Sequence, residues 1–142
     1  MPLASLVYVS FASHDLSDDE LRDILTVARD NNKTLNVTGM LLYRDRFFIQ
    51  VLEGEKEVVR SLFAHIGKDP RHHYVKLVCV DDIDKRSFGE WSMGFNKLGH
   101  EALAALPGYS DFLSQEHRTD YFTRNPGHAT ALLQSFKEQT YF

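Results

Sequence analysis

The run Phe47–Leu52, with the sequence FFIQVL, constrains the fold more than any other feature of the chain. A strand with one face in water alternates apolar and polar residues, whereas this run places large apolar side chains on both faces. The runs Leu6–Phe11 and Val75–Val80 share this pattern. We therefore expect a sheet with both faces covered by other parts of the chain.

The order of the expected elements predicts how that sheet is built. A helix begins after Ser17, because Glu20 follows at capping-box spacing, and runs to about Asn32. The other expected elements are a second helix over Val58–Ile66 and strands over Leu6–Phe11, Thr38–Tyr43, Phe47–Leu52, Val75–Val80 and Trp91–Phe95. This β-α-β-β-α-β order with an added strand predicts an α+β, ferredoxin-like sandwich. It has a five-stranded mixed sheet with two helices on one face.

The segment that follows this topology is expected to form a C-terminal helical extension. We divide the chain into a domain over residues 1–97 and an extension over residues 98–142. Ala129, Leu132, Leu133 and Phe136 have helical spacing, and Pro126 precedes them. The extension would cover the open face of the sheet or mediate oligomerisation.

Length and charge limit the classes of function. A chain of 142 residues leaves little room for both a sensor and an output enzyme. The net charge of −4, without a basic cluster, argues against nucleic-acid binding. The N-terminus resembles neither a signal peptide nor a membrane span. A single cysteine, Cys79, permits no intramolecular disulfide and fits a reducing compartment, so we expect a cytoplasmic protein without membrane partners.

Polar residues interrupt the expected core at two places. Gln50 lies in the central strand on the face of Phe48, which the helices would cover, and Tyr8 lies in the middle of the first strand. If these strands are neighbours, the two side chains can bond to each other. Alternatively, each bonds to backbone or water. Asn31 and Asn32 are either helix caps or donors for the edge of a planar heterocycle.

Motifs of conventional catalysis are absent, and we expect a protein that is not an enzyme. Cys79 has no activating neighbour in the sequence and is expected to be an inert buried thiol. His72 and His73 are adjacent and cannot both face one metal from a regular element, so no metal site is expected. Arg71 and His72 either hold an anion or form an exposed turn.

Several motifs together resemble the BLUF family of blue-light sensors that use FAD, over about residues 3 to 97. The chain also closely resembles the short, PixD-like single-domain members, which carry no fused output domain. It is carried by Tyr8 within LVYVS, Asn31-Asn32, VTGMLLY over Val37–Tyr43, FIQVLEG over Phe48–Gly54, DPRHH over Asp69–His73 and FGEWSM over Phe88–Met93.

The resemblance implies a flavin held noncovalently between the two helices. FAD is expected, although FMN or riboflavin would use many of the same contacts. Gln50 would lie between the flavin and the Tyr8 hydroxyl. The remaining cofactor-binding residues implied are Ile24, Asn31, Asn32, Phe48, Ile66, Asp69, Arg71 and His72. The short members also carry two C-terminal helices, for which His100–Leu106 and Ala129–Gln139 are the candidates here.

The resemblance also implies a photochemical function. Blue light would drive electron and proton transfer from Tyr8, and Gln50 would rearrange to give a red-shifted signalling state. Trp91 and Met93, expected on one face of the fifth strand, would relay the change. The signal would pass to a separate protein such as a response regulator, from a protein expected to be a homo-oligomer. A flavin-dependent oxidoreductase and a cofactor-free interaction domain are the alternatives.

Overall fold

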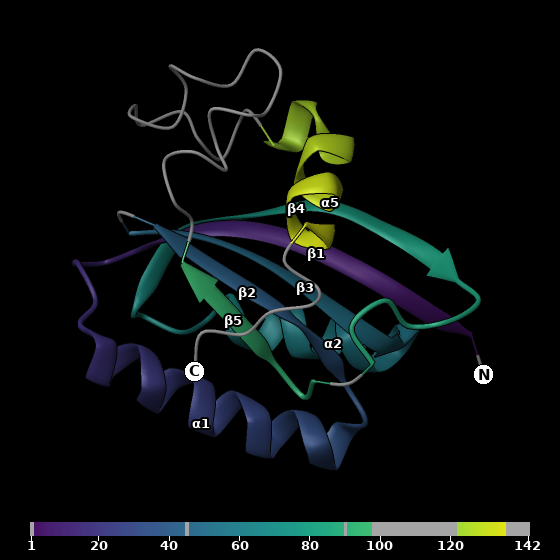
Figure 1. Ribbon diagram of the computed structural model, residues 1–142, viewed down its shortest axis with the longest axis horizontal. Coiled ribbons are helices and arrows are strands. Elements are labelled where there is room, and N and C mark those ends of the chain that lie inside the picture. The colour runs from purple at the N-terminus through teal and green to yellow at the C-terminus, as the bar shows by residue number, and fades with distance from the viewer. Residues whose placement is uncertain (1, 45, 90, 98–121, 136–142) are drawn as a thin grey trace.

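A five-stranded mixed sheet forms the centre of the protein (Figure 1). The computed structural model describes residues 2–44, 46–89, 91–97 and 122–135. The strands are β1 (Leu3–Ala12), β2 (Thr38–Arg44), β3 (Phe47–Glu55), β4 (His72–Ile83) and β5 (Gly94–Lys97), in the order β4-β1-β3-β2-β5. Only the β2–β5 pair of this sheet is parallel. The predicted ferredoxin-like α+β fold is confirmed.

Two helices, α1 (Asp18–Leu35) and α2 (Lys56–Ile66), cover one face of the sheet (Figure 1). The predicted capping box starts α1: Ser17 Oγ accepts from the Glu20 backbone N–H, and the Glu20 carboxylate accepts from the Ser17 N–H, both at 3.2 Å. The helix continues one turn beyond the predicted end and stops at Asn36, whose left-handed backbone (φ 56°) forms the C-cap. Asn31 and Asn32 therefore lie within the helix and do not cap it.

The opposite face of the sheet carries α5 (Pro126–Gln134) (Figure 1). Ala129, Leu132 and Leu133 are buried in one apolar cluster with the outward residues of β1, β2 and β3. Phe122 joins them by stacking on Phe47, with ring centroids 5.6 Å apart. The apolar pattern on both faces of the strands thus matches cover on both faces. The expected helix over His100–Leu106 lies outside the described residues.

The fifth strand begins later than predicted. The chain bends at Ser92 and Met93 and enters β5 only at Gly94, which pairs with Met40. Trp91 packs against the apolar cluster that includes α5, whereas Met93 belongs to the cluster under α1 and α2. The expectation that both side chains share one face of a strand is therefore wrong. The bend turns the chain between them.

Candidate functional site

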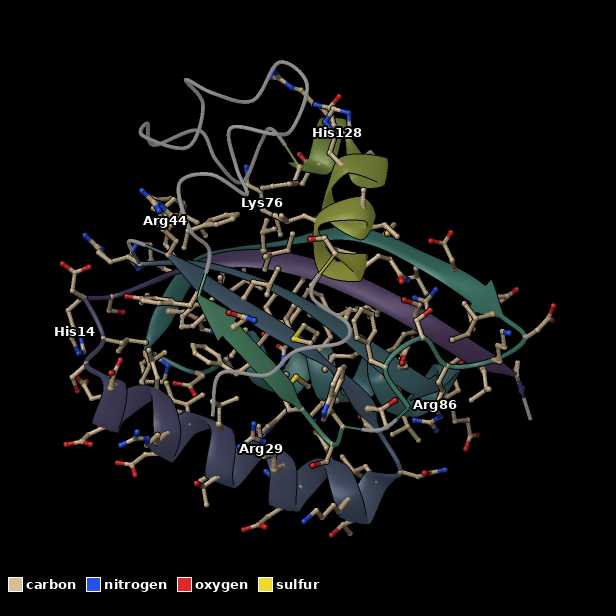
Figure 2. The ribbon with its side chains drawn as sticks, viewed as in Figure 1. His14, Arg29, Arg44, Lys76, Arg86 and His128 are labelled. Atoms are coloured by element: carbon tan, nitrogen blue, oxygen red, sulfur yellow. The ribbon has the colours of Figure 1, made fainter. Side chains whose placement is uncertain are left out.

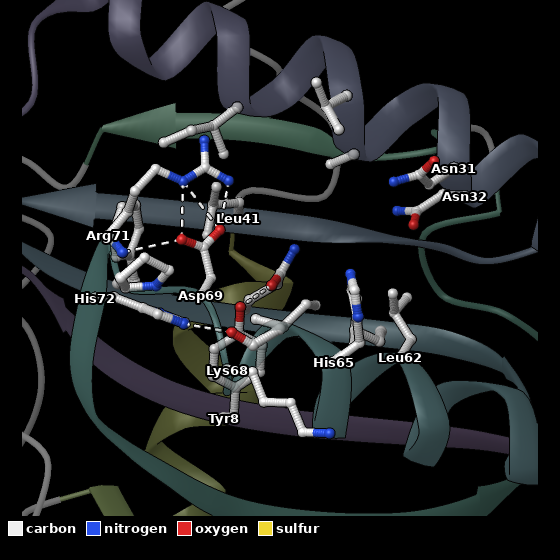
Figure 3. A pocket seen from close by; sticks show the side chains of 18 of the residues that line it. Tyr8, Asn31, Asn32, Leu41, Leu62, His65, Lys68, Asp69, Arg71 and His72 are labelled. Carbon is white, nitrogen blue, oxygen red and sulfur yellow. Dashed lines mark hydrogen bonds and ion pairs between the residues drawn. The ribbon is translucent and has the colours of Figure 1, made fainter.

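A cavity of about 570 Å³ lies between α1 and α2, above the sheet (Figure 3). Its volume is in the range of sites for small molecules and cofactors. Asn31 and Asn32 approach it from α1, Leu62 and His65 from α2, and Tyr8 from β1. The cavity thus combines apolar walls with a few polar groups that come from three different elements.

Tyr8 and Gln50 form the polar floor of this cavity. They are directly opposite each other in the register of β1 and β3, and both are buried. The Tyr8 hydroxyl donates to Gln50 Oε1, and Gln50 Nε2 donates to the sulfur of Met93 at 3.2 Å. The two polar residues therefore satisfy each other, which excludes the alternative of isolated core groups bonded to backbone or water. The Gln50 amide is engaged at both of its ends.

The Tyr8 hydroxyl is held in its neutral form. Burial raises the pKa of Tyr8, and the negative charge of Asp69 raises this pKa further. A neutral phenol keeps its proton for donation to Gln50 across the ordinary pH range. The Tyr8 hydroxyl is therefore the donor of this hydrogen bond in the arrangement that the structure shows.

The α1 wall supplies two side-chain amides. Asn31 is exposed and lines the cavity. Asn32 is only 2% exposed, and its Nδ2 donates to the Ser92 carbonyl at 2.7 Å. Because an amide has two N–H bonds and one carbonyl oxygen, Asn32 can bond to Ser92 and still offer a donor and an acceptor to a ligand.

Charged residues gather around Asp69 at another part of the cavity wall. The Arg71 Nε donates to both oxygens of Asp69, at 3.0 and 2.9 Å (Figure 3). The Arg71 guanidinium lowers the pKa of the Asp69 carboxyl, and Asp69 in turn raises the pKa of Arg71. Lys68 also lines the cavity. This part of the wall can meet an anionic group of a ligand.

His72 has both ring nitrogens engaged by the protein. Its Nε2 lies 2.7 Å from the Ile66 carbonyl and its Nδ1 lies 2.9 Å from the hydroxyl of the buried Ser10. A phosphate could take a hydrogen bond from this imidazole only if one of these contacts were given up. In this structure His72 ties the start of β4 to the end of α2 and to β1.

The structure brings nearly all of the predicted site residues to one cavity. Of these residues, Trp91 lies apart from it, and Met93 reaches the site through its contact with Gln50. Sequence reasoning missed His65, in the last turn of α2, and Lys68, which directly precedes the DPRHH motif. The predicted residues that line the cavity are Tyr8, Ile24, Asn31, Asn32, Phe48, Gln50, Ile66, Asp69, Arg71 and His72.

Cys79 lies outside this site, on the face that carries α5. Burial raises the pKa of its thiol to about 11, and Asp81 adds to the shift. The thiol is therefore protonated near neutral pH, which agrees with the expectation of an inert side chain.

The fold and the cavity define an α+β sandwich with a cavity of cofactor size, and comparison with known proteins assigns its family. The family model described as "BLUF: Sensors of blue-light using FAD" matches residues 3–94. The chain therefore belongs to the BLUF family of blue-light flavin sensors. No helix in the described parts of the chain has the length and apolar character needed to cross a membrane.

The curated relatives that match this chain include proteins several times its length. Photoactivated adenylate cyclase subunit alpha of Euglena gracilis is 39% identical over 80% of this chain, which spans only 11% of that cyclase subunit. The blue light- and temperature-regulated antirepressor BluF of Escherichia coli strain K12 is 28% identical over 99% of this chain and 35% of its own length. The chain thus spans a small part of these curated relatives.

Two solved structures resemble the chain over nearly their whole length. The photo-activated state of BlsA has a TM-score of 0.78 and 35% identity, and 99% of each chain is covered. The dark-state structure of BlrB, a BLUF protein, has a TM-score of 0.67 and 29% identity, with 92% of this chain and 96% of BlrB covered. The structural similarity therefore includes solved chains of about the same length as this one.

Proposed function

We propose that this chain is a blue-light sensor that binds a flavin noncovalently in the cavity between α1 and α2 and passes its signal to a separate protein. The observation that carries the proposal is the buried series of hydrogen bonds from Tyr8 through Gln50 to Met93 at the cavity floor. Such a series has two arrangements, because an amide can exchange the positions of its donor and its acceptor. It therefore suits a switch better than a catalytic site.

The residues around the cavity fit a flavin. Ile24 from α1 and Ile66 from α2 supply aliphatic surface for the two sides of a planar ring. Asn31 and Asn32 supply donors and acceptors for its polar edge, and Phe48 supplies apolar surface from β3. The wall that holds Asp69, Arg71 and His72 would face the ribityl-phosphate part. FAD is the flavin named in the family description, and we propose it here.

When bound, the flavin would absorb blue light and act as an oxidant in its excited state. Tyr8 is placed to give up an electron to the flavin while its phenol proton moves along the hydrogen bond to Gln50, and the electron and the proton would return to Tyr8 once Gln50 has rearranged. Gln50 would then change which of its ends faces Tyr8 and would release Met93. Because both residues are buried, no water competes for these bonds, and the new arrangement would persist until the original one re-forms thermally.

The signal would leave through contacts of the bend that carries Trp91 and Met93. We propose residues 1–97 as the sensing domain and residues 98–142 as an extension that covers the sheet or mediates oligomerisation, in a protein that forms a homo-oligomer. The names of the relatives indicate that similar domains serve different outputs, a cyclase in one and an antirepressor in another. For this chain we propose a separate signalling protein, such as a response regulator, and no catalysis of its own.

The test compares two tyrosine-to-phenylalanine variants after reconstitution with FAD. Tyr8→Phe removes the donor to Gln50, whereas Tyr43→Phe removes a buried hydroxyl that accepts from the Leu16 N–H on the same side of the sheet, outside the cavity. The wild type and Tyr43→Phe should show a reversible red shift of the flavin absorption under blue light. Tyr8→Phe should bind FAD and show no shift. A light response that survives Tyr8→Phe would refute the proposed role of this residue.

A further inference from the structure

The backbone of Ser92 and Met93 is held by two side chains of α1. Asn32 Nδ2 donates to the Ser92 carbonyl at 2.7 Å, and Arg29 Nε donates to the Met93 carbonyl at 2.8 Å. Residues 29 and 32 are nearly one helical turn apart and lie on the same side of α1. In Figure 2, Arg29 lies between α1 and β5. Two donors on one helix thus fix the bend that precedes β5.

Arg29 is more than a surface cation. Its side chain is half-buried, and this burial lowers the pKa of the guanidinium. Withdrawing a charged donor from water is unfavourable unless it finds an acceptor, and the Met93 carbonyl is such an acceptor. The bend and Arg29 therefore stabilise each other.

The same segment is attached to β3 at its other end. The buried carboxylate of Glu53 accepts from the backbone N–H groups of Ser87 and Phe88, both at 2.8 Å. Residues 87 and 88 are thus held to the sheet, and residues 92 and 93 are held to α1. Between these two attachments, the Trp91 carbonyl also accepts from the Gly39 N–H of β2 at 3.2 Å, whereas the carbonyls of Ser92 and Met93 are held by Asn32 and Arg29.

We propose that Arg29 is a positioning residue that keeps the Met93 thioether beside Gln50 and thereby determines how long the rearranged Gln50 persists. This inference rests on the proposed function. The Met93 side chain has three rotatable bonds, and its sulfur is a weak acceptor. Its ability to take back the Gln50 N–H therefore depends on where the backbone holds it. Without Arg29, we expect the original arrangement to return more slowly.

Three variants separate this role from a general effect on the fold. Arg29→Met keeps an unbranched side chain that ends at the position of the arginine Nε and removes the donor, whereas Arg29→Gln keeps an N–H donor at that position. Arg22→Met makes the same change at an exposed position two turns earlier in α1, where Arg22 pairs with Asp19 at 3.8 Å. Flavin content, the denaturation midpoint and the size of the light-induced shift should be similar in all three.

The lifetime of the red-shifted state is the first measurement. We expect dark recovery to be about fivefold slower in Arg29→Met, as suits the loss of one charge-assisted hydrogen bond. Recovery should stay within about twofold of the wild type in Arg29→Gln and Arg22→Met. If Arg29→Met does not fold, Arg29→Leu against Arg22→Leu replaces it, with slower recovery expected only at position 29, because leucine also lacks a donor.

The second measurement uses flavin-free protein, in which Trp91 is the only tryptophan of the chain. Its emission should change in Arg29→Met and not in Arg22→Met, because Trp91 lies two residues before the carbonyl that Arg29 holds. Equal recovery and equal emission in these two variants, with a wild type that responds to light, would overturn this inference alone. A wild type that binds flavin and shows no light response would overturn the proposed function, and the inference with it.

Discussion

The side-chain amide of Gln50 donates to the sulfur of Met93 at 3.2 Å, across the space between β3 and the bend before β5. The other end of the same amide accepts from the Tyr8 hydroxyl. The two contacts are unequal, because a thioether is a much weaker acceptor than the oxygen acceptors of a protein. The Met93 contact is therefore the one that Gln50 gives up at least cost when it rearranges.

Replacing Met93 by leucine tests the contribution of the sulfur. The change nearly preserves volume, so we expect it to lower the free energy of unfolding by less than about 1.5 kcal/mol. The Gln50 N–H would lose its acceptor, and dark recovery would slow. Met40→Leu is the matched control, because Met40 is fully buried in the cluster on the α5 side. Equal recovery rates in the two variants would show that the sulfur has no such role.

The raised pKa of Tyr8 predicts a specific loss of stability in alkali. In the unfolded chain Tyr8 ionises near its ordinary pKa of 10.0, whereas the folded protein keeps the phenol neutral to higher pH. The stabilisation is complete below pH 10 and is lost as the pH rises above it, by up to about 1.4 kcal/mol per pH unit. Denaturant unfolding from pH 8 to pH 11 should show this loss in the wild type relative to Tyr8→Phe. A difference that does not vary with pH would contradict the prediction.

Glu53 is predicted to stabilise the segment between β4 and β5. Its two carboxylate oxygens accept from the N–H groups of Ser87 and Phe88. Glu53→Gln would turn an amide N–H₂ toward one of these donors, so we expect a loss of about 1–3 kcal/mol in denaturant unfolding. Glu57→Gln, an exposed change on α2, should stay within about 0.5 kcal/mol of the wild type. Similar effects of the two variants would contradict the assignment.

Leu132 is predicted to hold α5 on the sheet. It is 2% exposed and packs in the cluster that contains Val7 and Ile49. Leu132→Ala should lower the free energy of unfolding by about 2–5 kcal/mol. Leu35→Ala, at a leucine that is 41% exposed at the end of α1, should cost much less. A small loss at position 132 would mean that α5 contributes little to the core.

Much of the fold could be predicted because its signals are local. The capping box of Ser17 and Glu20 and the apolar runs of β1 and β3 depend on near neighbours in sequence. The pairing of Tyr8 with Gln50 followed from the expected topology. The start of β5 was predicted wrongly, since apolar Trp91 and Met93 on either side of Ser92 resemble a strand. Two of the bonds that hold the bend come from Arg29 and Asn32 of α1, and another comes from the Gly39 N–H of β2.

The attachments of that bend could not be predicted from the sequence. Arg29 and Met93 are 64 positions apart, and Arg29 looks like an ordinary cation on an amphipathic helix. Glu53 did carry a signal, because alternation along β3 places it on the face of Ile49 and Val51. A charge that continues a buried face needs partners. Only the folded structure shows that the donors to the Glu53 carboxylate are the backbone N–H groups of Ser87 and Phe88.

The light-minus-dark absorption spectrum of the FAD-bound wild type tests the central claim most directly, with Gln50→Leu beside it. Leucine fills a similar volume and cannot exchange a donor for an acceptor. The account predicts a flavin band that moves reversibly to the red in the wild type and does not move in Gln50→Leu. A wild-type protein that binds FAD and keeps an unchanged spectrum under blue light, or a Gln50→Leu variant that responds like the wild type, would contradict it.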